Sequence, residues 1–297
     1  MNAAPTLVPL AVLETAGPDE TVPDTTAQEK LAALRGIVRG YGSAVVAYSG
    51  GVDSSLVMKV AHDELGARAL AVTVASAFLS TKELAFARSL AATTGAAFRV
   101  IGHDVAADAR LMANTDDRCY FCKFSEYGSM VEIAAAEGFA VVADGTQADD
   151  ALEAHRPGLR AVAERGVRSP LREAGMTKQH VRAVSRLLGL QTFDKASAPC
   201  LASRFPYGEA ITVAGLRKVE AAEDAVHALG FREVRVRIRP RPSGDLASVE
   251  VGFAELSRLS DPAVSIAVRN AVQSSGFAVV EVDPAGYHPS VPMLPSD

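Results

Sequence analysis

The stretch that decides the fold is Ala44–Ser55, AVVAYSGGVDSS. It combines a short apolar strand, a turn with two glycines and the start of a helix that we expect over residues 54–65. Gly50 and Gly51 let the backbone approach an anion closely, and the helix supplies unpaired N–H groups and the positive end of its dipole. Further hydroxyl donors come from Ser49, Ser54 and Ser55. The pattern therefore predicts a phosphate-binding turn.

Two better-known phosphate loops do not fit this turn. A Walker A loop would need a lysine and four residues between its glycines, and the dinucleotide-binding motif would need G-x-G-x-x-G. The letters SGG alone are equally typical of a glycine-rich turn with a serine cap. Their place directly after a strand, followed by Asp53, favours a site for the pyrophosphate part of a nucleotide. We expect Asp53 to contact Mg²⁺ or the nucleotide.

Strands and helices alternate on both sides of this turn. We expect strands over 44–48, 69–74, 98–101 and 139–143, and helices over 54–65 and 82–94. The second helix opens with Ser80 and Glu83 at the spacing of a capping box. Alternation of this kind is typical of an α/β fold with a parallel sheet covered by helices on both faces, in which ligands bind at the carboxyl ends of the strands. Asp144, Asp149 and Asp150 follow the last of these strands and are candidate magnesium or nucleotide contacts.

The character of the chain changes after a helix expected over 177–188, which Thr177 caps and Gly189 ends. A loop rich in proline, 198–208 (APCLASRFPYG), comes next. Beyond it we expect a small α+β unit with a helix over 212–229, strands over 233–239 and 247–251, a helix over 262–274 and a strand over 278–282. The predicted organisation is a mobile leader (1–29), a nucleotide domain (30–196), a smaller substrate-binding or oligomerisation domain (197–285) and a tail (286–297).

Composition narrows the function classes. The 297 residues are 48% hydrophobic and 22% charged, with a net charge of −5. This balance is that of a globular chain of about two domains, and the acidic surplus counts against broad nucleic-acid binding. The first 29 residues contain no lysine or arginine, and no apolar run reaches the length of a membrane span, so we expect a cytoplasmic protein. Three cysteines cannot all pair within one chain, which leaves Cys119, Cys122 and Cys200 without a disulfide explanation.

The string SGGVDSS resembles the PP-loop of the ATP pyrophosphatase superfamily, whose members adenylylate an oxygen and release pyrophosphate. Three later strings extend the resemblance: 144–150 (DGTQADD), 156–171 (RPGLRAVAERGVRSPL) and 198–204 (APCLASR). In this order they are similar to the LarE family of ATP-dependent sulfur transferases, which build the nickel-pincer nucleotide of lactate racemase. The resemblance covers about residues 30–285 and implies an adenine nucleotide α-hydrolase-like domain with a smaller C-terminal domain.

The resemblance also implies an activity. The family uses ATP and Mg²⁺ to adenylylate the carboxylates of pyridinium-3,5-biscarboxylic acid mononucleotide and converts them to thiocarboxylates, with AMP and pyrophosphate as products. In its simpler members the cysteine that matches Cys200 gives up its own sulfur and becomes dehydroalanine. The catalytic residues would be Cys200 and Asp53. The nucleotide site would comprise Ser49, Gly50, Gly51, Asp53, Ser54, Ser55, Asp144 and Gly145.

The sequence departs from the simple members at RCYFCK, residues 118–123. Three thiolates from Cys119, Cys122 and Cys200 can hold a 4Fe-4S cluster and leave one iron open. By resemblance to cluster-dependent thiolases, such an iron would carry sulfide from an external source. The alternatives are a sacrificial Cys200 without a cluster, a redox pair, a zinc site or two inert cysteines, although zinc would need a fourth ligand.

A row of arginines offers a site for the anionic substrate. The period of two in 233–239 places Arg235, Arg237 and Arg239 on one strand face, opposite Val234 and its apolar companions. Forked guanidinium groups suit a mononucleotide, and a solvated strand face is the plain alternative. We add Arg204, which shares a loop with Cys200, and Glu223 on the preceding helix, although carboxylates there can equally form the wet face of the helix.

Three competing functions remain. An amidating synthetase similar to NAD synthetase would have no use for three thiols. A tRNA thiolase conflicts with the acidic charge. A nucleotide-binding stress module without catalytic activity would need neither the APCLASR loop nor the arginine strand. We expect a homo-oligomer with no membrane partner.

Overall fold

The computed structural model describes residues 23–152 and 157–287. The first 22 residues of the predicted leader, Arg156 of the third motif and residues 288–297 of the predicted tail lie outside this range. Helix α1 (Asp24–Tyr41) begins inside the predicted leader, so the expectation of a leader up to residue 29 is wrong for its last six residues. Ala27, Leu34 and Val38 recur at helical spacing and are buried, which ties α1 to the rest of the fold.

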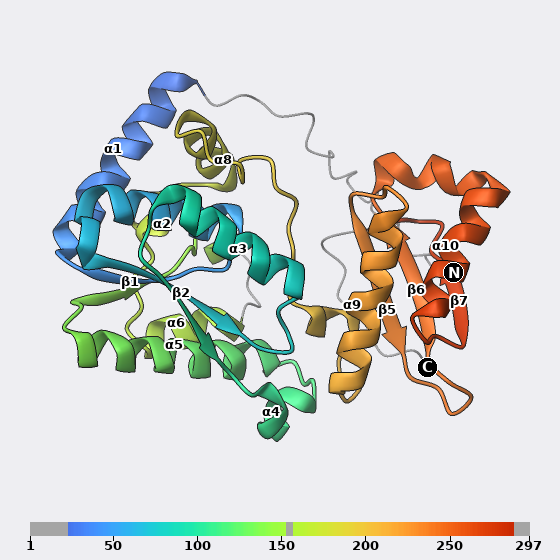
Figure 1. Ribbon diagram of the computed structural model, residues 1–297. Coiled ribbons are helices and arrows are strands. Elements are labelled where there is room, and N and C mark those ends of the chain that lie inside the picture. Colours follow the sequence, from blue (N-terminus) through green and yellow to red (C-terminus); the bar gives the residue numbers. More distant parts are fainter. Residues whose placement is uncertain (1–22, 153–156, 288–297) are drawn as a thin grey trace, which may run out of the picture.

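A parallel sheet organises the first unit, as the alternation of strands and helices predicts (Figure 1). Its strands are β1 (Ala44–Ala47), β2 (Ala69–Ala75), β3 (Phe98–Gly102) and β4 (Val141–Ala143). They lie in the order β3-β2-β1-β4, and every neighbouring pair is parallel. All four carboxyl ends therefore meet at one edge of the sheet, where the turn after β1 also lies.

Helices cover both faces of this sheet because its strands are apolar on both sides. Ala44 and Val46 of β1 pack in one core with α1, α2 (Val52–Leu65), α3 (Thr81–Thr94) and α8 (Lys178–Leu187). Val45 points the other way, into a second core with α5 (Arg118–Glu137) and α6 (Pro157–Glu164). Helix α5 follows the turn at Asn114 and was not predicted, and it carries both cysteines of RCYFCK in its first two turns.

Caps and short elements complete the first unit. Thr177 caps α8, as predicted, by accepting the backbone N–H of His180. The box expected at Ser80 and Glu83 is only half formed, because Ser80 accepts the Glu83 N–H while the Glu83 carboxylate pairs with Lys195 instead. The remaining short helices are η1 (Gly66–Arg68), η2 (Val105–Ala107), α4 (Ala109–Met112), η3 (Asp149–Leu152), α7 (Pro170–Glu173) and η4 (Leu201–Arg204).

The second unit is the predicted small α+β structure, on the right of Figure 1. Its elements are α9 (Val213–Ala228), β5 (Val234–Arg239), β6 (Leu246–Val251), η5 (Phe253–Ser260), α10 (Pro262–Ser274) and β7 (Val279–Val282). The three strands form a separate sheet in the order β5-β6-β7, antiparallel between β5 and β6 and parallel between β6 and β7. Among the described helices of the whole chain, none is long and apolar enough to cross a membrane.

The core of the second unit draws on the first. Phe78, which follows β2, and Val105 and Leu111, which follow β3, are buried in the same cluster as the side chains of α9, β5 and β6. Leu201 and Phe205, from the APCLASR loop, are buried there too. The loop that carries Cys200 is therefore packed between the two units.

Candidate functional site

The turn between β1 and α2 has the conformation that its glycines allow. Gly50 has φ +78°, and a Cβ there would lie 3.1 Å from the Cβ of Ala87. Gly51 is the N-cap residue of α2 and provides no side-chain cap, while the Ser54 hydroxyl donates to the Gly51 carbonyl oxygen at 3.3 Å. The Oγ atoms of Ser49 and Ser54 lie 3.1 Å apart. The first turn of α2 thus keeps its positive end uncapped by a side chain, as an anion site requires.

Two other predicted members of the turn serve packing. Ser55 is fully buried, and its Oγ makes no hydrogen bond within the described residues. Gly145, just after β4, is pressed against the turn, because a Cβ there would lie 2.8 Å from the Ser54 backbone nitrogen. The end of β4 can approach the first turn of α2 only as glycine.

Asp53 faces a lysine that sequence reasoning missed. The Nζ atom of Lys178 lies 2.7 and 2.6 Å from the two carboxylate oxygens of Asp53, although 125 residues separate the two. Lys178 is the first residue of α8, and its backbone N–H donates to the Asp149 carboxylate at 2.7 Å. A lysine one residue after a helix cap carries no motif of its own in a single sequence, and only the fold brings it to the turn.

A second lysine, Lys195, contacts the same turn. Its Nζ donates to the Gly50 carbonyl oxygen at 3.1 Å and to the Glu83 carboxylate at 2.7 Å, and it lies 3.9 Å from the centre of the Phe86 ring. Lys178 and Lys195 therefore place two positive charges beside the uncapped end of α2. This arrangement is chemically suited to a polyphosphate.

The carboxylates that follow β4 accept hydrogen bonds from neighbouring residues. Asp144 is buried, and its carboxylate accepts hydrogen bonds from the Tyr127 hydroxyl at 3.0 Å, the Thr146 N–H at 3.1 Å, the Thr146 hydroxyl at 2.5 Å and the Ser169 hydroxyl at 2.8 Å. Asp149 accepts from Lys178, and Asp150 accepts the Gln147 N–H at 2.9 Å. These contacts shape the turn that holds Gly145 in place, and the role of the three carboxylates as magnesium or nucleotide contacts stays a prediction.

The two segments that carry the three cysteines adjoin in space, as a shared site requires. Cys119 and Cys122 are partly buried in α5, and Cys200 is the exposed N-cap residue of η4. Hydrogen bonds from the first unit hold the Cys200 loop, including Leu201 N–H to the Phe78 carbonyl at 2.8 Å and Arg118 Nη1 to the Ala202 carbonyl at 3.0 Å. The segments lie close enough that negative charge on the Cys119 sulfur raises the pKa of Cys200.

The surroundings of Cys122 and Cys200 favour their neutral thiols. Burial raises the pKa of Cys122, and the Glu126 carboxylate, whose Oε1 lies 3.5 Å from the Cys122 sulfur, raises it further. Cys200 has exposed atoms, yet desolvation of its sulfur raises the pKa, which the guanidinium groups of Arg118 and Arg204 counteract. Within residues 23–152 and 157–287, no group of three or more His, Cys, Asp or Glu side chains is arranged to hold a metal ion. The three thiols are thus neighbours without a preformed metal geometry.

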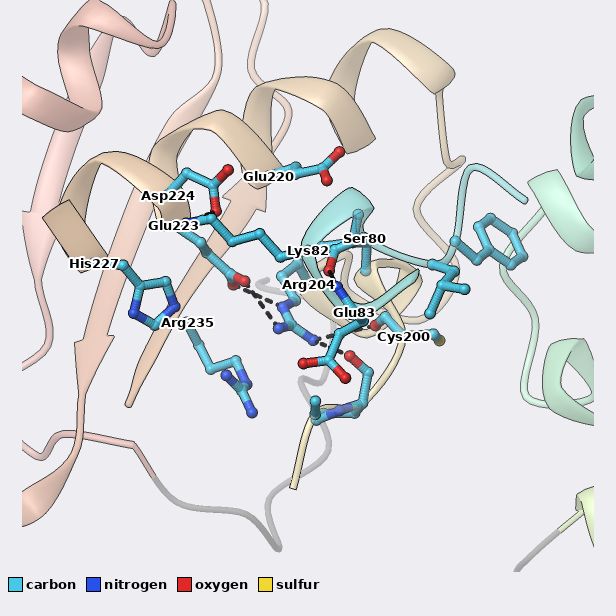
Figure 2. Close-up of a pocket in the computed structure, with 15 residues that line it drawn as sticks. Ser80, Lys82, Glu83, Cys200, Arg204, Glu220, Glu223, Asp224, His227 and Arg235 are labelled. Carbon is cyan, nitrogen blue, oxygen red and sulfur yellow. Dashed lines mark hydrogen bonds and ion pairs between the residues drawn. The ribbon is translucent and has the colours of Figure 1, made fainter. Parts of the chain in front are cut away.

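Cys200 lines a pocket between α3 and α9 (Figure 2), together with Ser80, Glu83, Arg204, Glu223 and Arg235. The buried Arg204 holds the wall of this pocket. Its guanidinium forms two hydrogen bonds with Glu223, at 2.8 and 3.0 Å, and donates to the carbonyl oxygens of Pro199 at 2.8 Å and Cys200 at 3.2 Å. In this structure Arg204 and Glu223, which we predicted as substrate contacts, bind each other, and Arg204 also binds the Cys200 loop.

The arginines of β5 alternate with buried residues as predicted, and they differ in their partners. Arg237 forms an ion pair with Glu250 and is neutralised there. Arg235 lines the pocket, donates to the carbonyl oxygens of Val234 and Ser197, and has a buried Nε without a partner among the described residues. Burial and the neighbouring charge of Arg204 lower the pKa of Arg235, so an anionic ligand in the pocket would stabilise its charged form.

The fold and site together define a two-part α/β protein of the PP-loop class, with a nucleotide-type turn in one part and a thiol-lined pocket between the parts. No family model matches the chain. The pyridinium-3,5-bisthiocarboxylic acid mononucleotide synthase of Lactiplantibacillus plantarum is 38% identical over 264 residues, which are 88% of this chain and 93% of that protein. The chain therefore belongs to the LarE family, the family of that synthase.

Two further relatives have no assigned function. An uncharacterized protein of Synechocystis is 40% identical over 260 residues, covering 88% of this chain and 95% of the relative. An uncharacterized protein of Methanocaldococcus jannaschii is 28% identical over 207 residues, covering 70% and 77% of the two chains. The similarity to the first extends across both units of the fold, because 88% of the chain cannot fit within either unit alone.

Proposed function

We propose that this chain is an ATP-dependent sulfur transferase that acts on the carboxylates of pyridinium-3,5-biscarboxylic acid mononucleotide. The observation that carries the proposal is the similarity, over nearly the full length, to a protein named as the synthase of the corresponding bisthiocarboxylic nucleotide. In the proposed reaction a substrate carboxylate attacks the α-phosphorus of ATP, pyrophosphate leaves, and hydrosulfide then displaces AMP from the acyl adenylate, with release of one proton. The product is a thiocarboxylate.

The ATP half of this proposal is supported by the turn at Gly50 and Gly51 and by the two lysines beside it. Phosphate oxygens would accept from the first turn of α2 and from Lys178 and Lys195. Mg²⁺ would bind the Asp53 carboxylate, whose oxygen ligands suit this cation. Because Lys178 holds both oxygens of Asp53 in the structure, loading of Mg²⁺–ATP would transfer this lysine from the carboxylate to a phosphate.

The nature of the nucleotide products tests this half. Incubation with ATP and the pyridinium substrate should release AMP and pyrophosphate, and release of ADP and orthophosphate would contradict the assignment. Asp53→Asn and Lys178→Met should each lower AMP formation at least tenfold. Lys59→Met is the matched control, because Lys59 lies on the same helix, α2, and pairs with Asp63 at its surface.

Arg235 is the proposed ligand for the substrate's anionic groups. Its unpartnered Nε and its place beside Cys200 support this role, whereas Arg237 is expected to act mainly through its pair with Glu250. Loss of one charged hydrogen bond costs about 1.5–3 kcal/mol, so Arg235→Ala should raise the substrate KM by a factor of roughly 10 to 150. The exposed Arg232→Ala is the control. An unchanged KM would return Arg235 to a structural role.

For the sulfur step we propose a 4Fe-4S cluster on Cys119, Cys122 and Cys200. The donor chemistry fits, since all three cysteines of the chain come from two segments that adjoin, although α5 and the Cys200 loop would have to shift to bring the sulfurs into ligand geometry. A bound cluster with three cysteine ligands would leave one iron open for an external sulfide. The rival route is sacrifice of Cys200 itself.

Anaerobic purification separates the two routes. The cluster predicts iron, sulfide and a broad visible absorption that are lost in each single Cys→Ala variant, together with repeated turnover when sulfide is supplied. The sacrificial route predicts iron-free protein, no dependence on Cys119 or Cys122, and a mass loss of about 34 Da at Cys200 after one turnover, because the thiolate is consumed.

A further inference from the structure

A buried arginine without a carboxylate stands between the two cysteine segments. Arg118 is 3% exposed, and within residues 23–152 and 157–287 no Asp or Glu forms an ion pair with it. Arg204, equally buried, shows the usual solution, since it is matched by Glu223. A buried charge is costly unless an opposite charge compensates it. Arg118 therefore needs an anion that none of the described carboxylates provides.

The contacts of Arg118 aim this charge at sulfur. Its Nη1 donates to the Asn114 side-chain oxygen and, at 3.0 Å, to the Ala202 carbonyl oxygen in the Cys200 loop. These bonds fix the plane of the guanidinium. Its Nη2 lies 3.8 Å from the sulfur of Cys119, and one face covers the Tyr207 ring at 5.3 Å. The charge also interacts with Cys200.

We propose that Arg118 attracts anionic sulfur, in the form of hydrosulfide, to the side of the thiol site formed by Cys119 and Cys200. The proposal deepens the proposed function, on which it rests, by naming the residue that receives the sulfur nucleophile. A guanidinium suits this task because it stays protonated at every working pH and is weakly hydrated. The carboxylate of Glu126 gives the opposite field at Cys122, so the positive charge is confined to one side of the thiol group.

Two alkylating agents that differ in one charge test the proposal. Iodoacetate is anionic and iodoacetamide is neutral, and the same thiolate displaces iodide from both. The ratio of the iodoacetate rate to the iodoacetamide rate at one cysteine therefore cancels the protonation of that cysteine and reports the local charge. The ratio is measured for each cysteine by peptide mass mapping, on the full chain freed of bound metal, at low salt. For Cys119 and Cys200 this ratio should exceed the ratio for glutathione at least threefold. The ratio at Cys122 should be lower than at these two cysteines.

The variants make the test specific. Arg118→Gln should lower the ratio at Cys119 and Cys200 at least threefold, Arg118→Lys should preserve most of it, and Arg110→Gln should leave it unchanged, because Arg110 is exposed and pairs with Asp108. An unchanged ratio in folded Arg118→Gln overturns the proposal. If that variant does not fold, a wild-type ratio at Cys119 and Cys200 no higher than that of glutathione overturns it as well.

The assay contains neither ATP nor the pyridinium nucleotide. A failed ratio therefore leaves AMP formation and thiocarboxylate synthesis untouched, and a failed sulfur-transfer assay leaves the alkylation ratio untouched. The two proposals can fall separately.

Discussion

Removal of Glu223 should destabilise the protein more than removal of any neighbouring surface carboxylate. Glu223 and Arg204 have side chains that are only 10% and 4% exposed, and two hydrogen bonds of 2.8 and 3.0 Å join them. Oε1 of Glu223 also accepts the Val236 backbone N–H of β5 at 3.0 Å. Breaking such a buried pair strands the partner charge, which costs about 3–5 kcal/mol. Glu223→Ala should therefore lower the free energy of unfolding by about that amount.

Urea denaturation followed by circular dichroism, with linear extrapolation, measures this loss. Asp224→Ala is the matched control on the next residue of α9, because Asp224 pairs with Lys82 while both side chains are at least 40% exposed, and an exposed pair contributes at most about 1 kcal/mol. The double variant Arg204→Met with Glu223→Leu should recover most of the stability, since no charge remains stranded. A loss for Glu223→Ala no larger than that of the control would refute the reasoning.

Gly145→Ala should lower nucleotide binding at least tenfold, because the new Cβ would meet backbone atoms of the turn, the Ser54 nitrogen at 2.8 Å and the Asp53 carbonyl carbon at 3.1 Å. Titration of a fluorescent ATP analogue measures it, and Gly36→Ala in open space on α1 should leave binding intact and stabilise the helix by up to about 1 kcal/mol. Burial, reinforced by the charge of Lys30, lowers the pKa of His180, whose neutral ring accepts the Thr177 N–H. Stability from His180 should thus be complete above about pH 6.5, the ordinary pKa of histidine, and be lost as the pH falls through the lower folded value. Urea midpoints at pH 7.5 and 5.5 should draw together in His180→Asn, and an unaltered pH dependence would contradict this.

Local patterns predicted the elements that have one clear apolar period. The strands of the parallel sheet were found within two residues at each end, and the helix at 262–274 was found with its bounds as α10 has them. Helix α5 was missed because the cysteine and aromatic residues at its start, RCYFCK, were interpreted as a ligand motif. The start of α1 was missed because Asp24 and its neighbours follow a stretch rich in proline and threonine.

The site was predictable where one segment makes it and unpredictable where several meet. The string SGGVDSS predicted its turn, because a strand, two glycines and a helix are consecutive in the chain. Lys178 and Lys195 reach that turn across more than a hundred residues, a distance that periodicity cannot bridge. The place of Asp144 after a strand predicted a ligand, but it could not predict the four hydrogen bonds that this carboxylate accepts. Arg204 was expected to face a substrate, and its ion pair with Glu223 could be seen only in the folded structure.

The shared core beneath the Cys200 loop limits how this protein could be rebuilt. Phe78, Val105 and Leu111 come from the nucleotide unit but are buried with α9 and the second sheet. A chain cut at the predicted boundary after residue 196 would expose these three side chains on one fragment and leave a gap in the other. A chimera that exchanges the small unit between distant relatives must therefore carry matched residues after β2 and β3, so the two units cannot be exchanged as independent modules.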